Sequence, residues 1–143
     1  MSTLSSSAWK DLPVKEKFFS FKGRLNRQLF ISLTLMTWIL AFAIARLSAL
    51  SRTAAGDTMG YIYVALAVLL AIPTTLMTLS IAVRRWHDLG KSWRCVFLNI
   101  GCSFILPLSA LLYMYLFCTK GTTGDNAYGP DPLQPAGATE QDN

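Results

Sequence analysis

Residues 59–83 read MGYIYVALAVLLAIPTTLMTLSIAV, a run of 25 residues without a charged side chain. At about 1.5 Å of rise per residue, an α-helix of this length reaches about 37 Å, which exceeds the roughly 30 Å hydrocarbon core of a bilayer. The run has no alternation of apolar and polar residues, so a membrane β-strand is a poor alternative. This stretch therefore predicts a transmembrane helix, and it decides the fold class.

Two more charge-free runs flank this stretch, at residues 29–45 and 95–119. The first is just long enough to span, because Arg46 can extend its side chain to the headgroups and let the helix run on toward Leu50. A cleaved signal peptide is the alternative for it, but the 28 residues before it are too long and too polar for an ordinary signal sequence. We expect an all-α integral membrane bundle of three transmembrane helices, at about 28–50, 59–83 and 95–119.

The composition supports this fold class. Hydrophobic residues make up 52% of the 143 residues and charged residues 15%, where an ordinary soluble domain has about 25% charged residues. These values exclude an intrinsically disordered chain and argue against a soluble enzyme. We expect one membrane domain over residues 13–132, with a short interfacial segment at its start and a turn-rich tail at its end. Residues 1–12 are expected to be a mobile tail and residues 133–143 a disordered one.

The basic residues predict the orientation. Of the 13 Lys and Arg residues, ten precede the first run or lie between the second and third, and three lie on the other side. The positive-inside rule then places the N-terminus and the 84–94 loop in the cytoplasm and the C-terminus in the periplasm of a bacterial inner membrane. Because the basic residues flank apolar runs, anionic phospholipids are the expected partner and nucleic acid is not.

Several polar or helix-breaking residues lie inside the runs. Pro73 and Pro107 predict kinks, and Asn99 predicts a hydrogen bond between helices. The second and third runs contain no Asp, Glu, Lys, Arg or His, which argues against an ion-coupled transporter. The three cysteines form no CxxC pair and fit small apolar core residues, so we expect neither a metal site nor a cofactor.

The loop 84–94, RRWHDLGKSWR, is the densest polar cluster. Gly90 fits a tight turn, and Ser92 fits the N-cap of the third helix. His87 beside Asp88 raises the possibility of a general base, but neighbouring residues on a helix point about 100° apart. The loop is better interpreted as a charged cytoplasmic hairpin whose arginines bind lipid phosphates or Asp88.

Three motifs in order resemble a known family: FSFKGRLNR at 19–27, VRRWHDLGKSW at 83–93 and KGTTGDNAYGPDP at 120–132. Together they are similar to the small bacterial inner-membrane family catalogued as domain of unknown function 805, from about Phe18 to Pro132. This chain has Trp86 where the family pattern has Leu, Lys91 where it has Arg, and no Gly before Trp93. The resemblance implies a helical inner-membrane protein and brings no reaction, substrate or cofactor.

The function expected from the sequence is a non-enzymatic membrane module that binds lipid or a protein partner through a basic cytoplasmic face. The residues expected on that face are Arg24, Arg27, Arg84, Arg85, His87, Asp88, Lys91 and Arg94. Those expected to have structural roles are Gly23, Pro73, Gly90, Ser92, Trp93, Pro107, Asn126, Tyr128 and Gly129. The alternatives are a subunit of a small oligomeric pore or transporter and a membrane enzyme that uses His87 as a base. The protein partner would be a second copy of the chain or another membrane protein.

Overall fold

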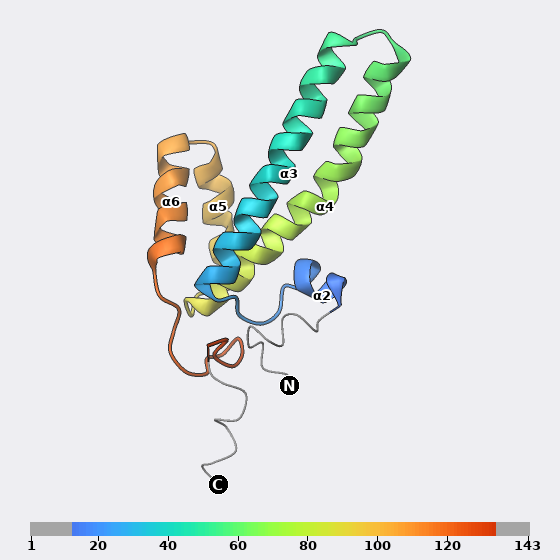
Figure 1. The fold of residues 1–143 in the computed structure, drawn as a ribbon. Helices are drawn as coiled ribbons and strands as arrows, with labels where there is room; N and C mark the ends of the chain where they lie inside the picture. Colours follow the sequence, from blue (N-terminus) through green and yellow to red (C-terminus); the bar gives the residue numbers. More distant parts are fainter. Residues whose placement is uncertain (1–12, 134–143) are drawn as a thin grey trace.

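The computed structural model describes residues 13–133, which contain helices, turns and loops but no β-strand (Figure 1). The all-helical class is thus confirmed for this part of the chain. The helices in chain order are α2 (Val14–Phe19), α3 (Arg27–Thr53), α4 (Thr58–Asp88), the short 3₁₀ helix η1 (Trp93–Cys95), α5 (Val96–Ser103) and α6 (Leu106–Cys118). The tails expected at 1–12 and beyond 133 lie outside the described residues.

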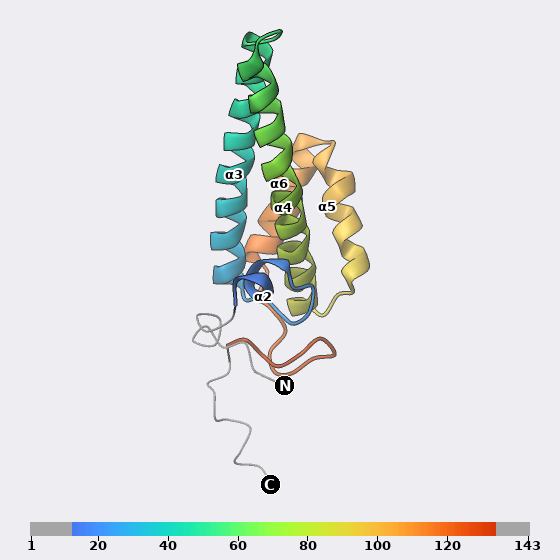
Figure 2. The ribbon, with the colours of Figure 1, turned by 90° about the vertical axis from the view of Figure 1, so that its right-hand side faces the viewer.

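Helices α3 and α4 form one long antiparallel hairpin (Figures 1 and 2). Asn26 caps the start of α3, since its side-chain oxygen accepts a hydrogen bond of 2.9 Å from the Leu29 N–H. Gly56 provides the positive φ of 94° in the turn between the two helices. With 27 and 31 residues, both helices are long and apolar enough to cross a membrane, as predicted.

The third charge-free run is not one helix, so a third spanning helix is not confirmed. It contains α5 with eight residues and α6 with 13, and the helical conformation is interrupted between them at Phe104 and Ile105. Ile105 is extended (φ −124°, ψ 101°), and Pro107 lies in the first turn of α6, where its missing N–H costs no hydrogen bond. Pro107 therefore starts a helix, and the prediction that it kinks a continuous one is wrong.

Helix α6 runs back to the end of α4 from which α5 departs (Figure 1). Trp86 near the end of α4 contacts both short helices: its indole N–H donates to Asn99 Oδ1 at 2.8 Å, and its ring lies 6.2 Å from that of Tyr115. The interhelical hydrogen bond predicted for Asn99 is confirmed. Residues 119–133 then lie at the same end as residues 20–27 and 84–95, and we call this end of the molecule the polar end.

This return corrects the predicted topology, in which residues beyond 119 lie across the membrane from the 84–94 loop. The main-chain N–H of Thr122 donates to the Asp88 carbonyl at 2.8 Å, so the segment after α6 packs directly on the end of α4. At about 1.5 Å per residue, α5 and α6 extend only about 12 and 20 Å, which is too short to cross a hydrocarbon core of roughly 30 Å. The two helices instead form a short hairpin beside the polar half of α3 and α4.

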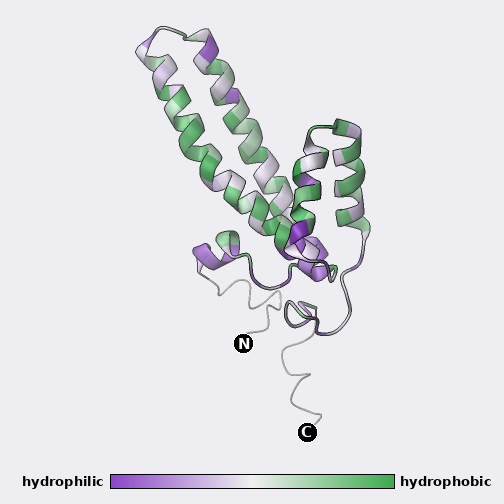
Figure 3. Cartoon of the chain, turned by 180° about the vertical axis from the view of Figure 1, so that it is seen from behind, coloured by the Kyte–Doolittle hydropathy of each residue, from purple (hydrophilic) through white to green (hydrophobic). Residues whose placement is uncertain are grey.

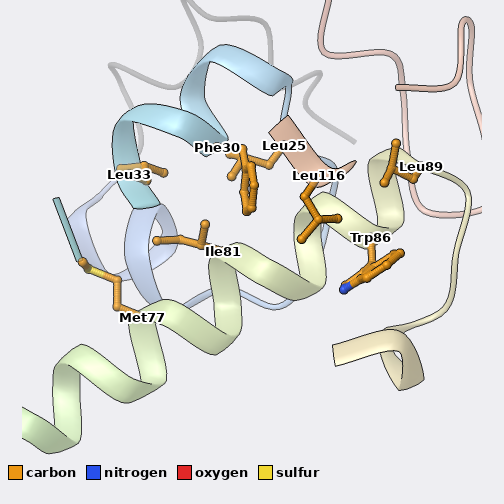
Figure 4. Packing of buried hydrophobic residues seen from close by; sticks show 8 residues of the cluster. All are labelled: Leu25, Phe30, Leu33, Met77, Ile81, Trp86, Leu89 and Leu116. Atoms are coloured by element: carbon orange, nitrogen blue, oxygen red, sulfur yellow. The ribbon is translucent and has the colours of Figure 1, made fainter. Parts of the chain in front are cut away.

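The hydrophobic core lies toward the polar end. Phe30 and Leu33 of α3, Ile81 of α4 and Leu116 of α6 meet in a buried cluster (Figure 4). The remaining halves of α3 and α4 extend beyond the other helices (Figure 1) and expose large apolar side chains. Figure 3 colours much of both helices green there, for hydrophobic residues. Apolar residues exposed on this scale need a lipid environment or a partner to cover them.

Trp38 and Pro73 lie within α3 and α4. The kink predicted at Pro73 stays a prediction. Helix α4 continues through Pro73, and the hydroxyls of Thr74 and Thr75 donate to the carbonyls of Leu70 and Ala71, one turn earlier. Trp38 of α3 faces α6, since its ring centroid lies 5.5 Å from that of Tyr113.

Candidate functional site

The centre of the candidate site is Asp88, the last residue of α4. Its Oδ1 accepts a hydrogen bond of 3.2 Å from Arg24 Nε, and its Oδ2 accepts one of 2.5 Å from Arg85 Nη1. All three side chains are at most 4% exposed. Within residues 13–133 these are the two ion pairs that form, and both guanidiniums share one carboxylate. We call this group the Arg24–Asp88–Arg85 cluster.

Arg85 joins the end of α4 to the end of α6. Its Nε donates to the Leu116 carbonyl at 3.0 Å, and its Nη2 donates to the Thr119 carbonyl. The last carbonyls of a helix have no partner within the helix and lie at the negative end of its dipole. The guanidinium therefore caps α6 while it neutralises Asp88.

Arg24 joins the same carboxylate to the segment after α6. Its Nη1 donates to the Gly124 carbonyl at 2.6 Å and its Nη2 to the Thr122 carbonyl. The close approach of this segment depends on Gly121, because a Cβ added there would collide with the Asp88 carboxylate. The cluster thus holds together three segments that are far apart in the sequence.

His87 takes part in a second set of contacts at the polar end. Its ring stacks on that of Tyr128, with the centroids 4.1 Å apart and the planes 2° from parallel, and its Nδ1 lies 3.3 Å from the Gly23 carbonyl oxygen. The Asn126 side-chain amide donates to the His87 carbonyl at 3.0 Å. Because both oxygens of Asp88 are bonded to arginines, Asp88 does not orient this imidazole as an acid–base pair would require.

Arg84 anchors α2 to the bundle. Its side chain is buried, and its Nη1 donates to the Lys17 carbonyl at 2.9 Å, near the end of α2. Its own main-chain carbonyl accepts the Leu25 N–H at 3.2 Å. Neighbouring arginines on α4 thus secure the segments before α3 and after α5.

The residues predicted for a lipid- or partner-binding face divide into two groups. Arg27, Lys91 and Arg94 are exposed at the polar end. Five others are buried, contrary to the expectation that they line a surface: Arg24, Arg84, Arg85, His87 and Asp88. Their polar groups form hydrogen bonds inside the protein. Main-chain carbonyls and the Asp88 carboxylate accept the hydrogen bonds that the arginines would otherwise donate to water.

Sequence reasoning missed the groups that receive these arginines. The carbonyls of Leu116, Thr119, Thr122 and Gly124 belong to residues whose side chains carry no relevant chemistry. The available signal was the pair of glycines at 121 and 124 directly after the third apolar run, since glycine permits close approach of another group to the main chain.

The residues predicted to be structural lie mostly in turns. Gly23, Gly90 and Gly129 have positive φ angles of 85°, 70° and 140°, which confirms the turn predicted at Gly90. Ser92 precedes η1 but its side chain forms no capping hydrogen bond, so that prediction is wrong. Trp93 is exposed beside Phe97, with the ring centroids 5.9 Å apart. Residues 13–133 contain no group of His, Cys, Asp and Glu side chains able to hold a metal ion.

The chain matches one family model and is similar to two inner membrane proteins. The family model described as "Protein of unknown function (DUF805)" matches residues 18–130. The inner membrane protein YhaI of Escherichia coli (strain K12) is 31% identical over 123 residues, which cover 85% of this chain and 92% of YhaI. The inner membrane protein YhaH of the same strain is 27% identical over 128 residues, 87% of this chain and 97% of YhaH. No solved structure matches the chain significantly.

Proposed function

This chain belongs to the DUF805 family, whose description names no activity, and from that premise we propose that it is a non-enzymatic inner membrane module whose polar end binds anionic lipid headgroups. The observation that carries the proposal is a set of exposed cations around that end, none of which forms an ion pair with another described residue: Lys15, Lys22, Arg27, Lys91, Arg94 and Lys120.

The buried cluster supports a positive surface in two ways. It removes the Asp88 carboxylate from the surface, which leaves Glu16, Asp125 and Asp131 as the acidic side chains of the polar end among the described residues. It also holds the segments that carry Arg27, Lys91 and Lys120 close together. The cations therefore act on one region of the membrane surface.

Burial and charge also support an orientation. Ten of the 12 Lys and Arg residues in 13–133 belong to the polar end, and Arg46 and Arg52 are the other two. By the positive-inside rule this end lies in the cytoplasm. Helices α3 and α4 then cross the inner membrane, and the hairpin of α5 and α6 enters it from the cytoplasmic side without crossing.

The strength of binding follows from surface electrostatics. Each Lys or Arg near an anionic leaflet contributes about 1 kcal/mol, and the attraction decays over a Debye length of roughly 8 Å at physiological salt. The preference for anionic lipid is therefore expected to be additive over the exposed cations and to weaken as salt is raised.

The test uses the full chain in mixed micelles, with phosphatidylglycerol or phosphatidylcholine as the titrated lipid. We expect the double variant Lys91→Gln/Arg94→Gln to lose about 2 kcal/mol of the preference for phosphatidylglycerol, or roughly 30-fold in affinity ratio. The matched control is Arg46→Gln/Arg52→Gln, which removes the same charge from the opposite end. Equal behaviour of both double variants would contradict the proposal.

The two alternatives are less well supported. An enzyme that uses His87 as a base needs an accessible imidazole, whereas the residue is 8% exposed and its ring stacks on that of Tyr128. An oligomeric pore stays a prediction that no particular contact in the structure favours.

A further inference from the structure

A cavity of about 220 Å³ lies at the polar end, between the start of α3 and the segment that follows α6. The residues that line it include the two basic residues Arg27 and Lys120, the polar residues Asn26, Gln28 and Thr123, and the buried Asp88. Two segments that are remote in sequence thus bring two cations to one small polar cavity.

The two cations are available to a ligand. Arg27 and Lys120 are exposed, and neither side chain forms a hydrogen bond or ion pair with another residue of 13–133. Their main chains are nevertheless fixed: Arg27 follows the Asn26 cap of α3, and Lys120 precedes Gly121, which packs against Asp88. Fixed attachment points reduce the ordering cost of binding.

The two carboxylates in the lining are already engaged. Asp88 accepts hydrogen bonds from Arg24 and Arg85, and Asp131 Oδ2 accepts one of 2.8 Å from the Gly124 N–H. Four cations in or directly behind the lining face two carboxylates, so the cavity carries an excess positive charge. A site of this charge favours an anion over a metal ion.

We propose that this cavity binds one phosphate group, with Arg27 and Lys120 as its charged partners and the Thr123 hydroxyl and the amides of Asn26 and Gln28 as neutral donors. Guanidinium and ammonium groups form the strongest hydrogen bonds to phosphate oxygens, and Arg does so through two parallel donors. The volume suits a small phosphate-bearing group rather than a drug-sized ligand.

The phosphate has two possible sources, the headgroup of an anionic lipid and a free phosphate ion. The lipid source rests on the function proposed above, whereas the phosphate site itself rests on the cavity alone. The proposed site differs from the general electrostatic attraction of the exposed cations to anionic lipid. It binds one phosphate group per chain, and its binding saturates.

The test measures saturable binding to the full chain in a neutral detergent, by calorimetry, with two probes titrated separately: short-chain phosphatidylglycerol and inorganic phosphate. Phosphatidylcholine serves as the lipid control. The site variant is Arg27→Gln/Lys120→Gln. The matched control is Arg46→Gln/Arg52→Gln, which removes the same charge from exposed positions outside the lining, at the opposite end of the molecule. Thermal unfolding of each variant in detergent checks that it is folded.

We expect one phosphatidylglycerol per chain, at least a tenfold loss of affinity in the site variant and less than a twofold change in the control. The same pattern with inorganic phosphate identifies a free ion as a ligand. Absence of saturable binding of either probe to the unaltered chain overturns the site. Equal weakening in both variants also overturns the site. The proposed preference for anionic lipid is tested separately, by comparing Lys91→Gln/Arg94→Gln with Arg46→Gln/Arg52→Gln. Saturable phosphate binding without any preference for phosphatidylglycerol over phosphatidylcholine supports the site and contradicts the proposed function.

Discussion

Arg85 shows how a charged side chain is accommodated inside this protein. Its side chain is fully buried, and its donors reach one carboxylate and two carbonyls at the end of α6. Moving a charge out of water costs several kcal/mol unless paired groups replace the lost hydration. Here the replacement is shared, because Asp88 serves Arg24 and Arg85 together and main-chain carbonyls accept the remaining donors. Removing the shared acceptor is therefore expected to affect both arginines.

The substitution Asp88→Asn tests this dependence. Loss of the carboxylate charge leaves two buried guanidiniums without a counter-ion, which is expected to lower the free energy of unfolding by about 3–5 kcal/mol. Thermal and denaturant unfolding of the full chain in detergent measures the effect. Asp57→Asn is the matched control, because Asp57 precedes α4 at the opposite end and its side chain forms no capping hydrogen bond. A loss in Asp88→Asn no larger than in this control would show that the cluster does not stabilise the fold.

The sequence identifies the residues of this site but not their surroundings. Arg24, Arg85 and Asp88 stand out as charged residues beside apolar runs, and such residues ordinarily face headgroups. Their burial depends on contacts across 64 positions between Arg24 and Asp88 and across 31 between Arg85 and Leu116. Spacing along the chain carries no information on contacts at that separation. The sequence therefore predicts that these arginines are exposed, whereas the structure buries them.

At the scale of the elements, length and composition distinguish α3 and α4 but not α5 and α6. The predicted spans at 28–50 and 59–83 agree with Arg27–Thr53 and Thr58–Asp88 to within a few residues. The run at 95–119 has the same apolar character as a spanning helix, and a hairpin of two short helices satisfies that composition equally well. What separates the two outcomes is the contact of α6 with the end of α4, through Leu116, Thr119 and Arg85.

The hairpin predicts that Lys91 and Lys120 are accessible from the same side of the membrane. In a chain whose native cysteines (Cys95, Cys102 and Cys118) are replaced by Ala, Lys91→Cys and Lys120→Cys are each treated with a membrane-impermeant maleimide. We expect both to react in inside-out vesicles and neither in intact spheroplasts. Ala55→Cys, in the turn between α3 and α4, is the control and is expected to show the opposite pattern. Labelling of Lys91→Cys and Lys120→Cys from opposite sides would instead require a continuous third span.

At the scale of the whole molecule, the two ends differ in charge and in packing. The polar end holds the core, the buried cluster and ten of the 12 basic residues in 13–133, whereas the opposite end consists of α3 and α4 alone with Arg46 and Arg52. Because the return of α6 moves Lys120 to the polar end, the asymmetry in basic residues is larger than a count based on three spans gives. The revised fold therefore strengthens the expected orientation of the polar end, and it puts the segment directly after α6 at that end instead of the opposite one.

Reporter fusions measure the absolute orientation of the molecule in the membrane. A fluorescent protein that folds only in the cytoplasm is expected to fluoresce at the C-terminus of the full chain, and alkaline phosphatase, which is active only in the periplasm, is expected to be inactive there. Alkaline phosphatase inserted after Ala55 is expected to be active, because the α3–α4 turn lies at the end with fewer basic residues. The two fusions together distinguish an error in the predicted orientation from an error in the α5–α6 hairpin. Activity at the C-terminus with inactivity after Ala55 would invert the molecule and contradict the charge argument, but leave the hairpin in place. Activity at both positions would place them on one side, which requires an even number of crossings between the α3–α4 turn and the C-terminus. In this fold α4 alone crosses there. Such a result would therefore require the segment of α5 and α6 to span the membrane.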